Sequence, residues 1–175
     1  MTELPVLGTE PLAVELANTL YGEGIDFLAT AEWVRAWFAE AMPGVVVPDP
    51  VQVRALRDAV HSVFSAVLDQ RVPDTASIDR VNSFAAAAPV CLSLSWPQAQ
   101  WTDTVSGPAA VLGRLASSCI EVVTGPYSLL RCPAPGCSMV FVRTHSRRRF
   151  CHPSCSHRDR QARYYRRLHP AGGVR

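Results

Sequence analysis

Four cysteines near the C-terminal end restrict the fold of this chain more than any other feature of its sequence. Four residues separate Cys132 from Cys137, thirteen residues follow, and three residues separate Cys151 from Cys155. Two close pairs allow two tight turns to present four thiolates to one ion at about 2.3 Å, in the tetrahedral geometry of structural zinc. The spacing therefore predicts one Zn²⁺ ion bound by these four cysteines.

Two alternatives to this ligand set have to be weighed. His145, His152 and His157 have suitable ligand chemistry, but a complete set of four cysteines leaves no vacancy for them. Four cysteines can also hold an iron–sulfur cluster, although the spacing fits a zinc finger better. Because four thiolates leave no open position for water, we expect a structural zinc on which the folding of residues 131–168 depends.

The residues around the cysteines predict the local structure of the finger. The segment 133–136 contains two prolines and a glycine, which predict that the chain turns between Cys132 and Cys137. Residues 139–143 are strand-like and residues 145–149 form a polar return, so a β-hairpin is expected between the two pairs. After Pro153 the pattern becomes helical, with the last cysteine in the first turn. A turn, a hairpin and a helix around four thiolates make a treble-clef-like finger.

The N-terminal part of the chain is predicted to be mostly helical, with a small antiparallel sheet. Helical spacing of apolar residues and capping residues such as Thr30 and Asp49 mark the helices. Arg57 and His61 fall outside the buried stripe of the third helix. The expected helices cover residues 11–20, Thr30 to Pro43, Asp49 to Gln70, Asp74 to Ala88 and Gly107 to Gly125.

Between the last two of these helices the apolar pattern changes to a period of two. Residues 90–96 alternate as a half-buried strand does, and a turn at Pro97 leads to a second strand around residues 100–105. Cys91 and Cys119 stand alone in apolar surroundings and are expected to be buried, inert thiols. The four tryptophans are expected to pack in the core rather than line a pocket; they are Trp33, Trp37, Trp96 and Trp101.

Charge divides the chain into two opposite parts. Residues 1–130 contain six Arg and fourteen acidic residues, whereas residues 131–175 contain eleven Arg and one acidic residue. In a view down the axis of the last helix, the side chains of Arg160, Arg163 and Arg167 fall within a sector of about 60°. The neighbouring face, which contains Tyr164, can pack on the finger. An Arg stripe next to a basic hairpin indicates phosphate contacts. The predicted DNA-binding residues are Arg147, Arg148, Arg158, Arg160, Arg163 and Arg167; the alternatives are a solvated face or a surface that docks on the acidic part.

Several motifs of the chain are shared with a known family. They are the pair Cys132 and Cys137, Phe141, the run Arg147–Arg149, Phe150-Cys151, Cys155 and the segment Tyr164-Tyr165-Arg166-Arg167. Together they resemble the CGNR-type zinc finger of bacterial proteins, whose N-terminal partner is the ABATE domain. Glu15-Leu16-Ala17-Asn18-Thr19-Leu20 is similar to the aspartate-phenylalanine-x-asparagine-threonine opening of that domain.

The chain departs from the family at the motif that gives the finger its name. Where the family has Cys-Gly-Asn-Arg, this chain has Cys155-Ser156-His157-Arg158, and His152 stands where a serine is usual. The ligand cysteine and the arginine are kept. The contacts made by Gly and Asn are lost, so a DNA sequence preference cannot be carried over from the family.

The resemblance implies a stress-responsive transcription regulator whose finger binds double-stranded DNA and whose ABATE domain binds a small ligand or a partner. The candidate ligand-binding residues are Asn18 and Thr19, with a helix-end cap as the alternative. One finger per chain offers few base contacts, so a homodimer is expected if binding is sequence-specific. The alternative function is a zinc-stabilised protein–protein interaction module.

These patterns predict two domains of an α+β protein. An ABATE-like ligand-sensing domain covers residues 1–128, a CGNR-like finger residues 129–170 and a flexible tail residues 171–175. With neither a secretory signal nor a run of eighteen apolar residues, we expect a cytoplasmic protein without membrane contact, associated with the nucleoid when it binds DNA. No nucleophile–base pair, phosphate loop or open metal site indicates an enzyme.

Overall fold

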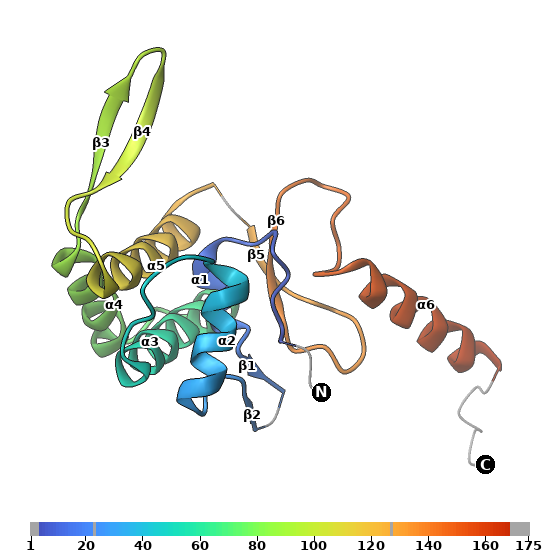
Figure 1. Ribbon diagram of the computed structural model, residues 1–175. Coiled ribbons are helices and arrows are strands. Elements are labelled where there is room, and N and C mark those ends of the chain that lie inside the picture. Colours follow the sequence, from blue (N-terminus) through green and yellow to red (C-terminus); the bar gives the residue numbers. More distant parts are fainter. Residues whose placement is uncertain (1–3, 23, 127, 169–175) are drawn as a thin grey trace.

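The structure, a computed structural model, describes residues 4–22, 24–126 and 128–168 (Figure 1). This part of the chain has six helices and three two-stranded antiparallel sheets, which confirms the α+β class. The helices are α1 (Leu12–Ala17), α2 (Ala31–Ala41), α3 (Pro50–Leu68), α4 (Thr75–Ala87), α5 (Pro108–Thr124) and α6 (Pro153–Leu168). The strand pairs are β1 (Leu20–Tyr21) with β2 (Ile25–Asp26), β3 (Val90–Ser95) with β4 (Gln98–Asp103) and β5 (Ser128–Arg131) with β6 (Val140–Arg143). The predicted tail, residues 171–175, lies outside the described residues.

Side-chain caps start three of the helices where the sequence predicts them. Thr30, Asp49 and Asp74 accept hydrogen bonds from backbone N–H groups in the first turns of α2, α3 and α4. These bonds satisfy donors that have no partner inside the helix. The polar capping residues therefore fix the beginnings of helices whose apolar stripes then meet in the core.

Helices α1, α2, α3, α4 and α5 surround one apolar core. Five of the six residues of α1 are buried, and this helix lies against both α3 and α5. Helices α4 and α5 run close together because Gly113 has no side chain; a Cβ atom there would lie 2.6 Å from the Cβ of Ala88. No helix in the described ranges is long and apolar enough to span a bilayer. The largest fully buried side chains of this core include Trp37, Phe38, Phe64, Leu56 and Leu115.

Arg57 is buried, contrary to the prediction that it lies outside the buried stripe of its helix. Its guanidinium group makes two hydrogen bonds to the carboxylate of Asp26 at the end of β2, and its Nε donates to Asp58 at 2.9 Å. The side chain of Arg57 is only 4% exposed. Helical periodicity could not reveal this burial, because the partner comes from a hairpin 31 residues earlier in the chain. His61 is exposed, as predicted.

Strands β3 and β4 form close to the predicted places, but the prediction that the first of them is half-buried is wrong. The hairpin projects from the helical body, so no second layer covers either face (Figure 1). Leu92, Leu94 and Trp96 are 60%, 75% and 86% exposed. Cys91 is exposed as well, whereas Cys119 is buried in α5 as predicted, and this burial raises the pKa of its thiol to about 12.

The tryptophans therefore divide between two environments. Trp37 is fully buried in the helical core, as predicted. Trp33 is half-buried and packs against the ring of Phe27 with 5.4 Å between the ring centroids. Trp96 stands exposed at the tip of the β3–β4 hairpin, so the expected core packing is wrong for this residue. The side chain of Trp101 lies outside what the structure describes.

The pairing partner of β6 differs from the prediction. Residues 145–149 do not form the second strand; β6 instead pairs with β5, which precedes the first cysteine, in a register that sets Leu130 opposite Phe141. Along β6 the side chains alternate between two apolar clusters. Val142 is buried in the helical core, and Phe141 is buried among the cysteines. The hairpin thus joins the finger to the helical body.

Replacement of Asp26 by Asn should destabilise the protein strongly, because it leaves the buried guanidinium of Arg57 without its anionic partner. We expect a loss of about 3 kcal/mol in the free energy of unfolding, measured by urea denaturation. The matched control is Asp58→Asn, where the carboxylate is 61% exposed and the expected loss is below about 1 kcal/mol. Equal effects of the two substitutions would contradict this role of Asp26.

Candidate metal centre and nucleic-acid interface

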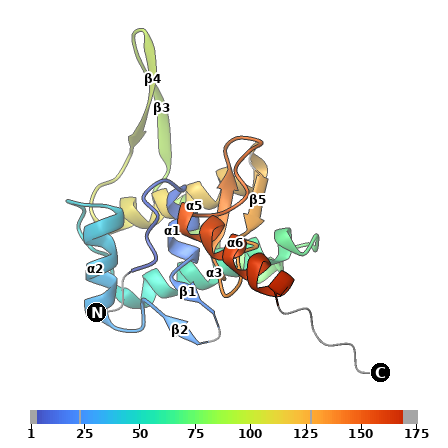
Figure 2. The same cartoon turned by 90° about the vertical axis from the view of Figure 1, so that its right-hand side faces the viewer.

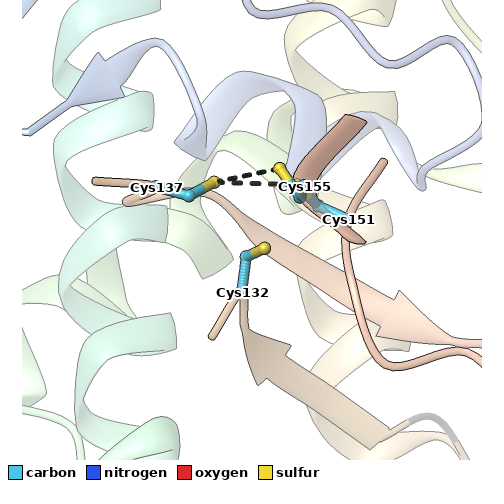
Figure 3. Close-up of side chains that lie close together, drawn as sticks. All are labelled: Cys132, Cys137, Cys151 and Cys155. Atoms are coloured by element: carbon cyan, nitrogen blue, oxygen red, sulfur yellow. Dashed lines mark hydrogen bonds between the residues drawn. The ribbon is translucent and has the colours of Figure 1, made fainter. Parts of the chain in front are cut away.

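The four predicted cysteine ligands come together at one end of the β5–β6 hairpin (Figure 3). Cys132 directly follows β5, Cys137 lies in the loop before β6, and Cys155 lies in the first turn of α6. The Sγ atom of Cys137 is 3.7 Å from that of Cys151 and 3.8 Å from that of Cys155, and the Cys151–Cys155 distance is 3.5 Å. All four Sγ atoms lie within 4.8 Å of one another.

This spacing fits one tetrahedral zinc ion. Zn–S bonds of about 2.3 Å place the sulfur atoms of a tetrahedron about 3.8 Å apart, which agrees with the three distances above. An iron–sulfur cluster holds several iron atoms between its cysteines and needs the sulfur atoms farther apart. The cluster is therefore a structural zinc site with four thiolate ligands.

Two backbone turns hold the first pair of ligands. The N–H group of Cys132 donates to the carbonyl of Met139 at 2.9 Å, and that of Cys137 donates to the carbonyl of Ala134 at 3.1 Å. Gly136, between them, has a φ of +68°, a conformation that residues with a Cβ atom rarely adopt. The glycine and the prolines of this loop thus allow both sulfur atoms to face the same point.

The crowding of the thiols shows why a cation is needed here. A hydrogen bond from the Cys151 thiol lowers the pKa of Cys137 to about 5. The same contact with Cys137, together with burial, raises the pKa of Cys151. One thiolate therefore opposes ionisation of the next, and a divalent cation is required to hold all four as thiolates.

The three histidines that could have replaced a cysteine are not part of the cluster. Within the described residues, the group of ligand atoms consists of the four cysteines. His145, His152 and His157 are all exposed. The Nδ1 atom of His152 accepts a hydrogen bond from the backbone N–H of Ser154 at 3.2 Å, at the beginning of α6. His152 thus stabilises the start of the helix.

Asn18 connects the helical body to the finger. Its side-chain Nδ2 donates to the carbonyl of Val140 at 3.0 Å, and its Oδ1 accepts from the N–H of Val140 at 2.8 Å. Thr19 donates to the carbonyl of Leu16 at 2.6 Å, as a residue at a helix end does. Both side chains are buried. Their polar groups are used inside the protein, which favours the structural alternative over ligand contact.

Arg148 is also used inside the protein. Its guanidinium group donates to the carboxylate of Glu10, to the carbonyl of Val142 at 2.9 Å and to the carbonyl of Cys151 at 3.1 Å. It lies over the ring of Phe141, 5.1 Å from the centroid, and its side chain is 15% exposed. The second oxygen of Glu10 accepts from the N–H of Val142 at 2.8 Å. Arg148 therefore serves as an internal support of β6.

The sequence reasoning missed Glu10, whose side chain is completely buried. Glu10 lies 138 residues before Arg148, in an irregular segment ahead of α1, so no local pattern marks it. A signal was nevertheless present in the charge difference between the two parts of the chain, since it makes contacts between an N-terminal carboxylate and a C-terminal arginine favourable.

The other predicted DNA-binding arginines lie at the surface. Arg147, Arg160, Arg163 and Arg167 are exposed, and α6 extends away from the body (Figure 1). The prediction that one face of α6 packs on the finger is wrong: Cys155 is the buried residue of this helix, and Tyr164 is 60% exposed. The helix leaves the finger after its first turns, and its later residues, from Arg163 to Leu168, are exposed in the described part of the chain.

Two models of known families match the chain. The family model described as "Putative stress-induced transcription regulator", ABATE, matches residues 10–126. The chain belongs to the ABATE family. The model of the CGNR zinc finger matches residues 129–168. Neither description names a catalytic activity. No curated protein matches the chain.

The altered motif of this CGNR finger keeps the contact between its arginine and the metal site. Arg158 donates from Nη2 to the Sγ of Cys155 at 3.2 Å, which offsets part of the negative charge of the thiolates. Ser156 is half-buried and His157 is exposed. The two substituted positions therefore change the surface of the ABATE-family protein beside the zinc site, while the ligand set is unaffected.

Zinc analysis of the purified protein should find one zinc ion per chain. Cys151→Ser should lower the bound zinc at least about tenfold, because a tetrahedral site with three thiolates binds zinc more weakly. The matched control is Cys91→Ser, since Cys91 is exposed in the β3–β4 hairpin; this variant should keep one zinc. A Cys151→Ser protein with a full complement of zinc would contradict the ligand set.

Truncation of Asn18 should weaken the attachment of the finger. Asn18→Ala leaves the N–H and C=O of Val140 without their partner, so we expect a loss of about 2–3 kcal/mol in the free energy of unfolding. Asn82 in α4 is exposed, and Asn82→Ala should change this free energy by less than about 0.5 kcal/mol. Urea denaturation of the zinc-loaded proteins measures both values, and a loss for Asn18→Ala within the range of the control would refute the connection.

Proposed function

We propose that this protein is a transcription regulator that binds double-stranded DNA through the zinc finger, residues 129–170, and binds a small ligand or partner through residues 1–128. The observation that carries the proposal is the exposed helix α6, which holds five arginines and one acidic residue. A basic helix that projects from a zinc-stabilised base is suited to lie along phosphate groups or in a groove.

The proposed contact surface consists of Arg147 in the loop before α6 and Arg160, Arg163 and Arg167 on the helix. Arg163 has an acidic neighbour, Asp159, 3.1 Å from its Nε, but more than half of its side chain remains exposed. Arg158 stands at the base of this surface, where one of its nitrogen atoms contacts the zinc site. Arg148 is left out, because its guanidinium group already has partners inside the protein.

The ligand of the helical domain is proposed to bind between α3, α4 and α5. A cavity of ≈ 350 Å³ opens there, which is within the range of small-molecule sites. Its lining is apolar except for a few groups such as Asn82 and Thr124. This location replaces Asn18 and Thr19, since the polar groups of both contact the protein itself. An uncharged, mainly apolar molecule would match the lining.

A protein–protein module is the second candidate function. Tyr164 and Leu168 of α6 are 60% and 54% exposed beside the arginines. Apolar groups next to basic groups also suit an acidic protein partner. The two functions differ in their response to nuclease: a complex with a protein partner survives the digestion of DNA.

DNA binding is tested by a salt titration with fluorescently labelled duplex DNA and zinc-loaded protein. Affinity should fall steeply with salt concentration. The double variant Arg160→Gln/Arg167→Gln should reduce the slope of log K against log[salt] by about 2, because two phosphate contacts are lost. The control is Arg35→Gln/Arg80→Gln, which removes two exposed arginines of the helical body and should leave the slope unchanged. A flat salt response or no binding would reject the proposal.

A further inference from the structure

We infer that the β3–β4 hairpin is a dimerisation arm, through which two copies of this chain associate. The inference starts from the exposed apolar side chains Leu92, Leu94 and Trp96. Leu92 and Leu94 alternate along β3 and therefore belong to one face of the ribbon, and Trp96 follows them in the turn. On the opposite face, Ser93 donates to the carbonyl of Gln100 at 3.0 Å and lies 3.0 Å from the hydroxyl of Thr102. The arm therefore has one apolar face and one polar face.

The arm is anchored firmly to the body at its base. Thr104 donates to the carbonyl of Pro89 from both its hydroxyl, at 2.6 Å, and its N–H, at 3.3 Å. Asp103 forms an ion pair with Arg114 of α5 at 2.8 Å. A ribbon held this way presents its apolar face to the solvent in a fixed position. Two-stranded ribbons are only marginally stable without a covering partner, so a partner on this face would stabilise the arm.

The absence of charge on the arm favours a second copy as the partner. The segment from Val90 to Thr102 contains no acidic or basic residue. In a two-fold symmetric contact, identical surfaces face each other, and any charge near the axis would meet a like charge. A neutral arm avoids this repulsion. It also has no group that would attract nucleic acid, an acidic or basic protein or an anionic lipid headgroup.

The edges of the arm support the same partner. Exposed edge strands are usually protected from pairing by charged side chains or prolines. Here, Pro97 lies in the turn, and β3 and β4 contain neither a proline nor a charge before Asp103. Both outer edges can therefore pair with a second copy. The arm keeps no feature that would prevent self-association.

The area of the arm is consistent with a dimer of moderate strength. Burial of Trp96 alone removes about 150–250 Å² from water, and all the side chains from Cys91 to Gln100 are exposed and available for contact. A standard interface needs roughly 800 Å² per partner. An arm of two short strands offers an interface of limited size, so monomer and dimer should exchange with protein concentration.

Dimerisation through the arm leaves the DNA-binding surface free. The arm and α6 point away from the body on different sides (Figure 1, Figure 2). The inference does not depend on DNA binding, because the contact involves neither the zinc site nor the arginines of α6. The two proposals can therefore fail separately.

The test is sedimentation equilibrium of the full-length, zinc-loaded protein over a wide range of concentrations, without DNA. The wild-type protein should pass from the mass of one chain to that of two. Leu94→Ser/Trp96→Ser should raise the dissociation constant of the dimer at least about tenfold. Leu94→Val/Trp96→Phe keeps the arm apolar and should keep the dimer, which separates loss of contact from loss of the hairpin.

The matched control substitutes two apolar residues that are exposed elsewhere. Val46→Ser/Val72→Ser changes side chains that are 62% and 88% exposed and should dimerise like the wild type. A wild-type protein that stays monomeric at all concentrations overturns the inference, including the case in which the monomer binds a phospholipid vesicle instead. Dimerisation of Leu94→Ser/Trp96→Ser with wild-type affinity, or open-ended aggregation of the wild type, overturns it as well.

Discussion

Strand β6 is the element on which the rest of the structure depends, because it is held from both sides by different interactions. Asn18 pairs with the N–H and C=O of Val140, as a neighbouring strand would. Glu10 and Arg148 bind the N–H and C=O of Val142. The opposite edge of β6 pairs with β5. The loop between these two strands carries the first two zinc ligands. The finger is therefore fixed to the helical body by the same strand that helps to build the metal site.

The opposite charges of the two parts of the chain serve two purposes. A small number of ion pairs link the two parts, Glu10 with Arg148 in the interior and Asp69 with Arg131 at the surface. Outside, the arginines of α6 are exposed, and the contacts of Arg158, Arg160 and Arg163 are with residues of the same helix. Charge segregation in a sequence thus does not distinguish a docking contact from a binding surface; the two uses are separated by the partner that each arginine has in the structure.

Local features of the fold could be predicted from the sequence, because they depend on neighbouring residues. The caps at Thr30, Asp49 and Asp74, the zinc ligands and the strand segments of the β3–β4 hairpin all follow from short patterns. The burial of Arg57, the internal role of Arg148 and the pairing of β5 with β6 could not be predicted, since each depends on a residue distant in sequence. The exposure of Leu92 and Leu94 was missed because alternation predicts a two-sided strand but not whether a second layer exists.

The alternation of side chains along β6 couples the metal to the helical core. Val142 belongs to the helical core and Phe141 to the apolar cluster around the cysteines. Unfolding of either one therefore exposes part of the strand that both share. The free energy of zinc binding is then shared by the whole chain. By reciprocal linkage, zinc stabilises the helices by the same amount by which the folded helices increase the affinity of the finger for zinc.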